Sequence, residues 1–234
     1  MPRIFLLSPA NCSGKRAQMV LQPRAEFDLA RRLRAEGAPL GEVFAFVSGL
    51  YFRGKLAYAS RFAAPPELDH PLIGSGVHVI TPNAGLRSPD TVVTADALRQ
   101  FAGSGIDAEN ERYRVPLEQS ALALQSEIGD SDVVLLGSIA SPKYVDVLLG
   151  IFGERLHFPA AFVGRGDMSR GGLLLRQVAA GEELPYISVA GAVRTGVRPP
   201  KLEPLRGRSS GTEDANGSPV TNRAGAPRRK TSIG

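Results

Sequence analysis

Side chains that could bind an anion gather in five short stretches of this chain, each directly after a segment with strand character. The stretches span residues 8–16, 48–55, 81–91, 137–144 and 162–172. In an open α/β sheet, ligands bind beyond the carboxyl ends of the strands, so parallel strands would bring all five to one crevice. Their polar and charged members are Cys12, Lys15, Arg16, Tyr51, Arg53, Lys55, Asn83, Arg87, Asp90, Lys143, Arg165, Asp167 and Arg170. This many cations among small residues favours an anionic ligand.

The stretch GSIASPKY, residues 137–144, is the first candidate for such a contact. Ser141 followed by Pro142 is a favourable helix start, since the hydroxyl can cap the helix and proline needs no amide partner. The free amides and the dipole of that first turn attract a phosphate or carboxylate, and Lys143 adds a cation. The sequence leaves open whether a ligand binds here or Ser141 alone satisfies the amides.

The stretch VGRGDMSRGG, within residues 163–172, is the second candidate. Its glycines permit close approach of a ligand, and Arg165 and Arg170 could each bind an oxyanion with two hydrogen bonds. Asp167 could instead pair with either arginine as a local brace. The amount of glycine and charge favours a functional loop.

The segment LYFRGKLAYASRF, residues 50–62, interleaves aromatic and cationic residues. Such a pattern can stack bases and contact phosphates, but helical spacing also fits ordinary packing. Packing is the expectation for Tyr58 and Phe62, whereas Tyr51 and Arg53 stay open to ligand binding.

The stretch SPANCSGKR, residues 8–16, matches neither of two known anion-binding motifs. A P-loop has a glycine where Pro9 stands, and a cysteine-phosphatase loop has an arginine where Gln18 stands. Cys12 could be a low-pKa thiolate beside Lys15 and Arg16, but the lack of a histidine partner favours an unreactive residue. No histidine-based triad emerges.

Composition places the chain among ordinary globular proteins, with 43% hydrophobic and 22% charged residues. The net charge of +5 lies mostly in residues 201–234, which carry seven Lys or Arg against three acids, whereas the first 200 residues carry 21 against 20. We expect one α/β domain over residues 1–200 and a disordered basic tail over 201–234, because the tail has almost no large apolar residue. No apolar run approaches the ~20 residues of a membrane span, and a single cysteine with three scattered histidines argues against a disulfide or structural zinc. These features favour a cytoplasmic protein.

Short apolar runs alternate with helical patterns along the chain. Strands are expected at residues 4–7, 43–47, 77–80, 133–136, 155–158 and 186–189, several of them apolar throughout, as in strands buried on both faces. Helical stripes fall on residues 27–33, on 117–128 with Pro116 in the first turn, on 145–152, and on a shorter helix near 174–178 closed by Gly181. This order predicts a three-layer α/β fold, with a mostly parallel sheet flanked by helices.

Three segments resemble the YaaA-type peroxide-stress proteins: RIFLLSPA, VITPNAGLRSPDT and VVLLGSIASPKYVDVL. The segments LYFRGKLAYA and AGLRSPDT also resemble a related, poorly characterised bacterial and phage family. The positions that match the motifs are Ser8, Pro9, Gly85, Leu86, Pro89, Asp90, Ser138 and Tyr144. The resemblance implies an α/β fold, nucleic-acid binding and a role in protecting DNA during oxidative stress, with Ser8 and Ser138 among the ligand contacts.

Two functions fit these residues. The first is a nucleic-acid- or nucleotide-associated protein that binds DNA, or acts on a base or its glycosidic bond in a cleft of strand-end loops. Arg165, Arg170 and Lys15 would hold phosphate, Tyr51 or Tyr144 would stack a base, and Asp90 or Asp167 would be the general acid or base.

The alternative is an enzyme acting on a small phosphorylated metabolite or free nucleotide, or a non-catalytic sensing or scaffold protein. The near-neutral balance of residues 1–200 favours a closed pocket, while the resemblance favours nucleic acid. The sequence leaves the cofactor undetermined, and Asp90, Asp96 and Asp167 lack metal-loop spacing.

Overall fold

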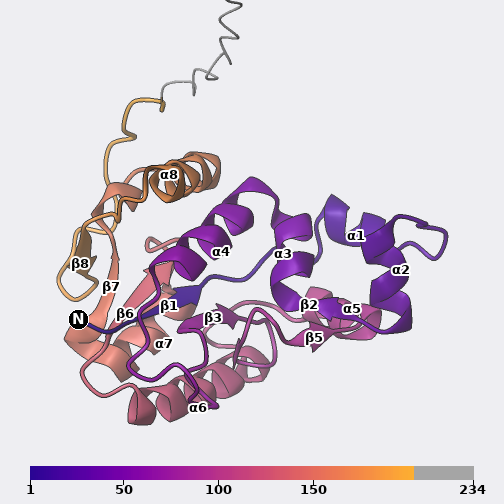
Figure 1. Ribbon diagram of the computed structural model, residues 1–234, viewed down its shortest axis with the longest axis horizontal. Coiled ribbons are helices and arrows are strands. Elements are labelled where there is room, and N and C mark those ends of the chain that lie inside the picture. Colours follow the sequence, from indigo (N-terminus) through magenta and orange to yellow (C-terminus); the bar gives the residue numbers. More distant parts are fainter. Residues whose placement is uncertain (203–234) are drawn as a thin grey trace, which may run out of the picture. The chain divides into compact units, whose positions relative to one another are not determined.

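The structure is a computed structural model that describes residues 1–202. The described chain contains a six-stranded sheet in the order β4-β3-β1-β6-β7-β8 and a two-stranded ribbon, β2-β5 (Figure 1). The strands are β1 (Arg3–Leu7), β2 (Ala38–Pro39), β3 (Val77–Ile80), β4 (Leu86–Arg87), β5 (Val92–Val93), β6 (Asp132–Leu136), β7 (Leu156–Pro159) and β8 (Tyr186–Ser188). The α-helices are α1 (Lys15–Leu21), α2 (Asp28–Ala35), α3 (Leu40–Ser48), α4 (Leu50–Phe62), α5 (Ala95–Gly103), α6 (Glu111–Glu127), α7 (Pro142–Phe152) and α8 (Asp167–Ala180). Single 3₁₀ turns, Gly153–Arg155 and Ala160–Phe162, flank β7.

The predicted three-layer α/β fold with a largely parallel sheet is confirmed. The four central strands, β3, β1, β6 and β7, run parallel, and the short edge strands β4 and β8 pair antiparallel to their neighbours. The central strands are almost wholly buried, because α4 and α8 cover one face and α6 and α7 the other (Figure 1). The predicted tail, residues 201–234, lies outside the described residues except for its first two. No helix within residues 1–202 is long and apolar enough to cross a membrane.

One predicted strand is wrong: residues 43–47 belong to helix α3. The run is rich in Val and Phe, which favours a strand, but its buried members fall at Leu40, Val43, Phe44 and Val47. That i, i+3, i+4, i+7 spacing is the signature of a helix with one face in the core. Residues 48–55 are therefore not a strand-end loop, and Tyr51 and Arg53 lie on helix α4.

Two helices are longer than the sequence predicted. Helix α6 begins at Glu111, where the Asn110 side chain accepts the Arg112 N–H at 3.1 Å, so Pro116 lies in the second turn rather than the first. Helix α8 begins at Asp167 and includes most of the stretch predicted as a glycine-rich loop.

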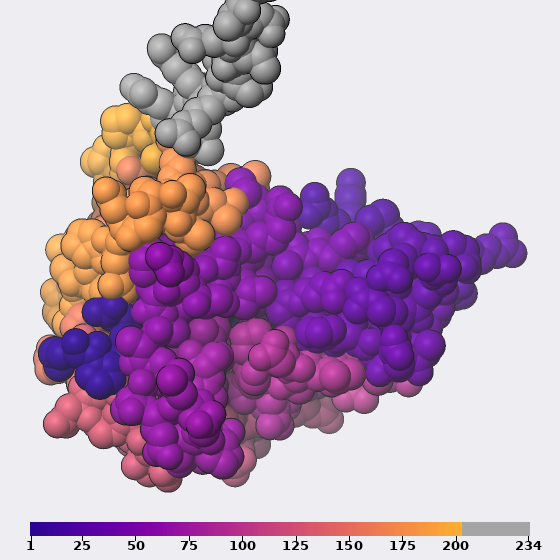
Figure 2. Space-filling model, viewed as in Figure 1, coloured from indigo at the N-terminus to yellow at the C-terminus, as the bar shows by residue number. Residues whose placement is uncertain are grey.

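The glycines of that stretch serve helix packing. A Cβ on Gly171 would lie 2.8 Å from the Tyr51 Cα, and one on Gly54 would lie 2.7 Å from the Gly171 carbonyl oxygen. Only glycine allows α4 and α8 to approach this closely. Figure 2 shows the two segments, purple and orange, in direct contact at the surface. The contact fixes the position of Tyr51 and of Lys55, one turn further along α4.

Candidate functional site

A pocket of about 700 Å³ opens beyond the carboxyl ends of β1 and β6. These strands are neighbours in the sheet, but the chain leaves β1 toward β3 on one side and leaves β6 toward β7 on the other. Such a topological switch point separates the two connecting loops and is where open α/β sheets bind their ligands. Figure 1 shows α1, α2, α3, α5 and the β2-β5 ribbon gathered at the same end of the sheet.

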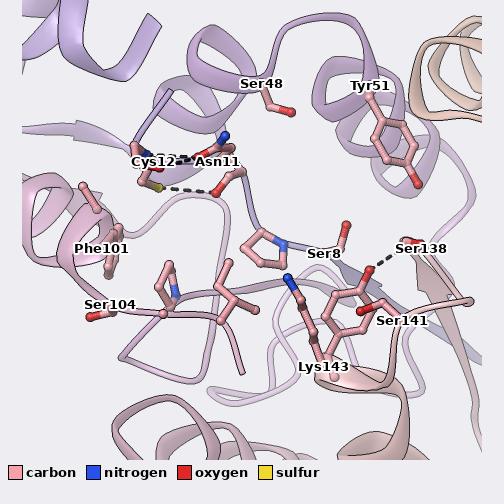
Figure 3. Close-up of a pocket in the computed structure, with 18 of the residues that line it drawn as sticks. Ser8, Asn11, Cys12, Ser48, Tyr51, Phe101, Ser104, Ser138, Ser141 and Lys143 are labelled. Carbon is pink, nitrogen blue, oxygen red and sulfur yellow. Dashed lines mark hydrogen bonds between the residues drawn. The ribbon is translucent and has the colours of Figure 1, made fainter. Parts of the chain in front are cut away.

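The pocket has a polar wall and an apolar wall. Hydroxyl groups dominate the polar wall, and Lys143 and Asp167 are its charged members; the apolar wall comes from the segment around α5 and from two prolines. The polar lining consists of Ser8, Asn11, Ser13, Ser48, Tyr51, Ser104, Ser138, Ser141, Lys143, Tyr144 and Asp167, and the remainder of Pro9, Ala10, Cys12, Pro82, Phe101, Ala102, Gly105 and Ile106. In Figure 3, Ser8, Ser138, Ser141 and Lys143 lie together on one side of the pocket, and Phe101 and Ser104 lie on another.

The structure brings about half of the predicted site residues to this pocket. Those that line it are Ser8, Tyr51, Ser138, Ser141, Lys143, Tyr144 and Asp167; those that do not are Lys15, Arg16, Arg53, Asp90, Arg165 and Arg170. Asp90 is exposed in the segment between β4 and β5, and Lys15 is exposed at the start of α1.

The arginines predicted to bind oxyanions make contacts within the fold. Arg170 is buried, donates from Nε and Nη2 to the Phe162 carbonyl oxygen and pairs with Asp167 at 3.5 Å. Arg165 donates to the Ala161 carbonyl oxygen at 2.9 Å and to the Ser169 hydroxyl at 3.2 Å. The alternative that Asp167 braces an arginine is thus the one the geometry shows.

The start of helix α7 is open to a ligand. Ser141 has the extended backbone of an N-cap residue, but its side chain accepts no hydrogen bond from the helix, and Pro142 occupies the first turn. Lys143 makes no ion pair with any described residue. The first-turn amides therefore keep their capacity to bind an anion, beside an uncompensated cation that lines the pocket.

Two tyrosines stand at the inner end of the pocket. The Tyr144 hydroxyl accepts the Ser138 backbone N–H at 2.7 Å, which anchors the loop after β6 to α7. Tyr51 is buried, and its hydroxyl has no hydrogen-bond partner of good geometry among the described residues, although the Arg170 guanidinium is near. Burial raises the pKa of both phenols, so both are protonated donors at neutral pH.

A buried lysine lies directly behind Ser8. The Lys55 ammonium is 1% exposed, and its Nζ lies 2.6 Å from the Ser8 carbonyl oxygen and 2.9 Å from the Ser8 Oγ. Its remaining neighbours include the rings of Tyr51 and Phe52, whose centroids are 4.7 and 4.8 Å away. Burial lowers the pKa of Lys55 to about 7, and the charge of Asp167 opposes this change.

The pairing of Lys55 with Ser8 is the feature that sequence reasoning missed. Both residues fall within predicted ligand-binding stretches, but the sequence predicts a loop after a strand for the stretch that contains Lys55. The available signal was the helical spacing of the apolar residues at positions 40, 43, 44 and 47. This spacing identifies a helix before Gly49 instead of a strand, so Lys55 falls on the next helix, α4, and its side chain packs against Ser8 at the end of β1.

Cys12 lines the pocket. Burial raises its pKa to about 12, and its Sγ lies 3.5 Å from the Ala10 carbonyl oxygen. Both features support the expectation of an unreactive residue, which stays a prediction. Among residues 1–202, no cluster of three His, Cys, Asp or Glu side chains could hold a metal ion.

Comparison of the chain with protein-family models, with curated proteins and with solved structures finds no match. The resemblance to YaaA-type proteins stays a prediction.

Proposed function

We propose that the chain binds a small anionic ligand of the nucleotide class in the switch-point pocket, with its phosphate at the start of α7. The observation that carries this proposal is the uncapped first turn of α7 beside Lys143, at the edge of a pocket of about 700 Å³. Backbone amides and a helix dipole bind phosphate well when no side chain of the protein occupies them.

The rest of the lining suits a molecule with a flat ring and a polar remainder. Phe101, Ile106 and Pro82 supply apolar surface on which a base could pack, while serine hydroxyls supply donors and acceptors for a sugar. The Tyr51 hydroxyl, buried beside the pocket with the Arg170 guanidinium near, forms no hydrogen bond of good geometry among the described residues. A buried polar group without a partner is costly, so a ligand that pairs with it gains affinity.

The size and charge of the pocket favour a nucleotide over a polymer. Its volume falls within the range of small-molecule sites. Binding of a nucleic-acid strand needs a row of cations along the backbone, but Lys143 is the single cation of the lining among the described residues.

Isothermal titration calorimetry with AMP, ADP and ribose 5-phosphate tests the proposal. We expect binding to the full chain, and about tenfold weaker binding to Lys143→Ala, a loss of about 1.4 kcal/mol. Lys15→Ala is the matched control, because Lys15 is also an exposed lysine near a helix start but lies outside the pocket. Equal losses in both variants, or no binding of any of the three ligands, would contradict the proposal.

Fluorescence anisotropy with labelled single-stranded DNA at about 50 and 200 mM salt examines the nucleic-acid alternative. Binding that weakens steeply with salt, and that Lys143→Ala leaves unchanged, would favour a polymer surface elsewhere on the chain over the proposed pocket.

A further inference from the structure

Burial of Lys55 makes its neutral amine accessible near neutral pH. A buried ammonium is normally paired with a carboxylate, because desolvation of an isolated charge is expensive. Lys55 has no ion pair among the described residues; its Nζ faces one carbonyl oxygen, one hydroxyl and two aromatic rings. The neutral amine can donate to the Ser8 carbonyl oxygen while its lone pair accepts the Ser8 hydroxyl proton.

Ser8 stands between this amine and the pocket. It follows β1 at the switch point, is 6% exposed and lines the pocket. A Cβ on Gly137 would lie 2.8 Å from the Ser8 Cβ, 3.1 Å from its Oγ and 2.9 Å from the Tyr144 hydroxyl oxygen. The absence of a side chain at position 137 therefore lets the Ser8 hydroxyl sit among β1, the loop after β6 and helix α7.

Tyr144 completes the surroundings of the hydroxyl. It accepts the Ser138 N–H, which leaves its own proton free to be donated toward Ser8 or toward a group bound there. A hydrogen bond with Ser8 also opposes the rise in the pKa of Tyr144 that burial causes. Tyr144 is thus a positioning residue that holds the loop and the hydroxyl together.

We propose that Ser8 is a nucleophile and Lys55 its general base, and that the pocket carries out acyl transfer on a carboxylic ester or amide. A serine next to a neutral lysine is one of the known ways to activate a hydroxyl, and it needs neither histidine nor metal. The proposed nucleotide site implies that the acyl group belongs to a phosphorylated molecule, and this part of the proposal rests on the proposed function. The assignment of Ser8 and Lys55 as nucleophile and base does not depend on it.

The reaction balances with the groups present and water. The Ser8 Oγ–H passes its proton to Lys55 Nζ as Oγ bonds to the carbonyl carbon. The tetrahedral adduct then expels the alcohol or amine, which takes the proton from Lys55, and leaves an acyl ester on Ser8. Water attacks this ester, Lys55 takes a proton from the water and returns it to Ser8 Oγ, and the carboxylic acid departs.

Labelling with an alkyl fluorophosphonate tests the nucleophile directly. The probe bonds its phosphorus to a reactive serine oxygen and releases fluoride, so intact-mass spectrometry and peptide mapping report the site. We expect one adduct, on Ser8, and none in Ser8→Ala. Ser126→Ala is the control, because Ser126 is an exposed serine on α6 and lies outside the pocket. An adduct spread over several serines, or its absence, would overturn the proposal.

The role of Lys55 is tested by substitution and by pH. Lys55→Met keeps the shape of the side chain without its base, and we expect labelling at least about 100-fold slower. In the unmodified chain the labelling rate should rise with pH and level off above about 7, as Lys55 loses its proton. The other titratable or charged groups around Lys55 and Tyr51 are Asp167, Arg170 and Tyr144.

Each result decides between a catalytic and a merely structural lysine. A rate that is flat across this pH range would overturn the proposal even if Lys55→Met fails to fold, because a lysine that only ties β1 to α4 does not affect the reactivity of Ser8. The probe carries no nucleotide, so labelling of Ser8 does not depend on the anion site at α7. Failure of nucleotide binding and failure of the nucleophile are therefore separate results.

Discussion

Two hollows of similar size in the described part of the molecule differ in how their polar groups are satisfied. The switch-point pocket measures about 700 Å³, and the second, beside α1, α2 and α3, about 600 Å³. The second is lined by Arg16, Phe27, Asp28, Leu29, Glu42, Ala45, Phe46 and Arg53. Its two carboxylates both pair with Arg32, and Arg16 donates to the Phe46 carbonyl oxygen at 3.3 Å. At the first, Ser141 does not cap its helix, and Lys55, buried behind the lining residue Ser8, has no carboxylate partner.

This difference indicates that the number of charged residues in a hollow does not identify it as a ligand-binding or catalytic site. The second hollow holds more cations, but its carboxylates are neutralised by neighbours within the fold. The first holds fewer charges, but its hydrogen-bonding groups lack partners or sit in costly environments. Such groups are retained at sites of binding and catalysis more often than in purely structural positions. Substitutions inside and outside the pocket test that distinction.

Gly137→Ala should damage the switch-point pocket most. The new methyl group would overlap Ser8 and Tyr144, so we expect fluorophosphonate labelling of Ser8 to fall about 100-fold and stability to fall by about 1–3 kcal/mol. Labelling kinetics and urea denaturation measure the two effects.

Gly150→Ala is the matched control for that change. Gly150 lies inside α7 and has no atom within 4 Å of its Cβ position. Alanine should raise stability by about 0.5–1 kcal/mol and leave labelling unchanged. If Gly137→Ala labels as fast as Gly150→Ala, the position of the Ser8 hydroxyl does not matter for its reactivity, and the site loses its main geometric support.

His78 is a buried group outside the pocket with an unpaired ring nitrogen, so we expect it to affect the stability of the fold and not the reactivity of Ser8. It lies in β3 and burial lowers its pKa to about 4, while its Nε2 has no partner among the described residues. Between pH 6.5 and about 4, the unfolded chain therefore binds a proton that the folded chain does not. Stability should fall by on the order of 3 kcal/mol as pH drops through that window.

Urea denaturation at several pH values measures this loss. His78→Gln removes the titrating group, so the acid-induced loss should shrink by most of that amount. Labelling of Ser8 at neutral pH should not change, because His78 does not line the pocket. A large drop in labelling would show that a substitution in the core alters the reactivity of Ser8. The separation of groups that affect only stability from groups that affect the pocket would then be wrong.

The sequence predicts the sheet well because its central strands are short, continuous apolar runs such as 133–136, which become buried on both faces. It misplaces residues 43–47 because the same residue types also suit a buried helix, and only their spacing separates the two. Residues 137–144 are placed correctly, since Ser141 and Pro142 mark a helix start regardless of the rest of the fold.

The site is harder to predict because it depends on contacts between distant segments. Ser8 and Lys55 are 47 positions apart and meet only after α4 packs under α8 through Gly54 and Gly171. Arg165 and Arg170 have the chemistry of anion-binding residues, but carbonyl oxygens of the neighbouring turn satisfy them. Composition cannot tell a satisfied arginine from one that is free to bind a ligand.

The double variant Arg16→Ala/Arg53→Ala should have the smallest effect. Both side chains line the second hollow, and the one hydrogen bond seen for Arg16 ends on a backbone carbonyl. We expect nucleotide affinity and Ser8 labelling to change by less than about twofold, because exposed charges distant from a ligand are screened by solvent and salt. Calorimetry with ADP and the labelling assay measure both, with Lys143→Ala as the comparison. If the double variant instead loses binding to single-stranded DNA while Lys143→Ala keeps it, the second hollow is a nucleic-acid surface. The second hollow would then be a site although its carboxylates are paired within the fold, and the contrast between the two hollows would reflect two ligands rather than one.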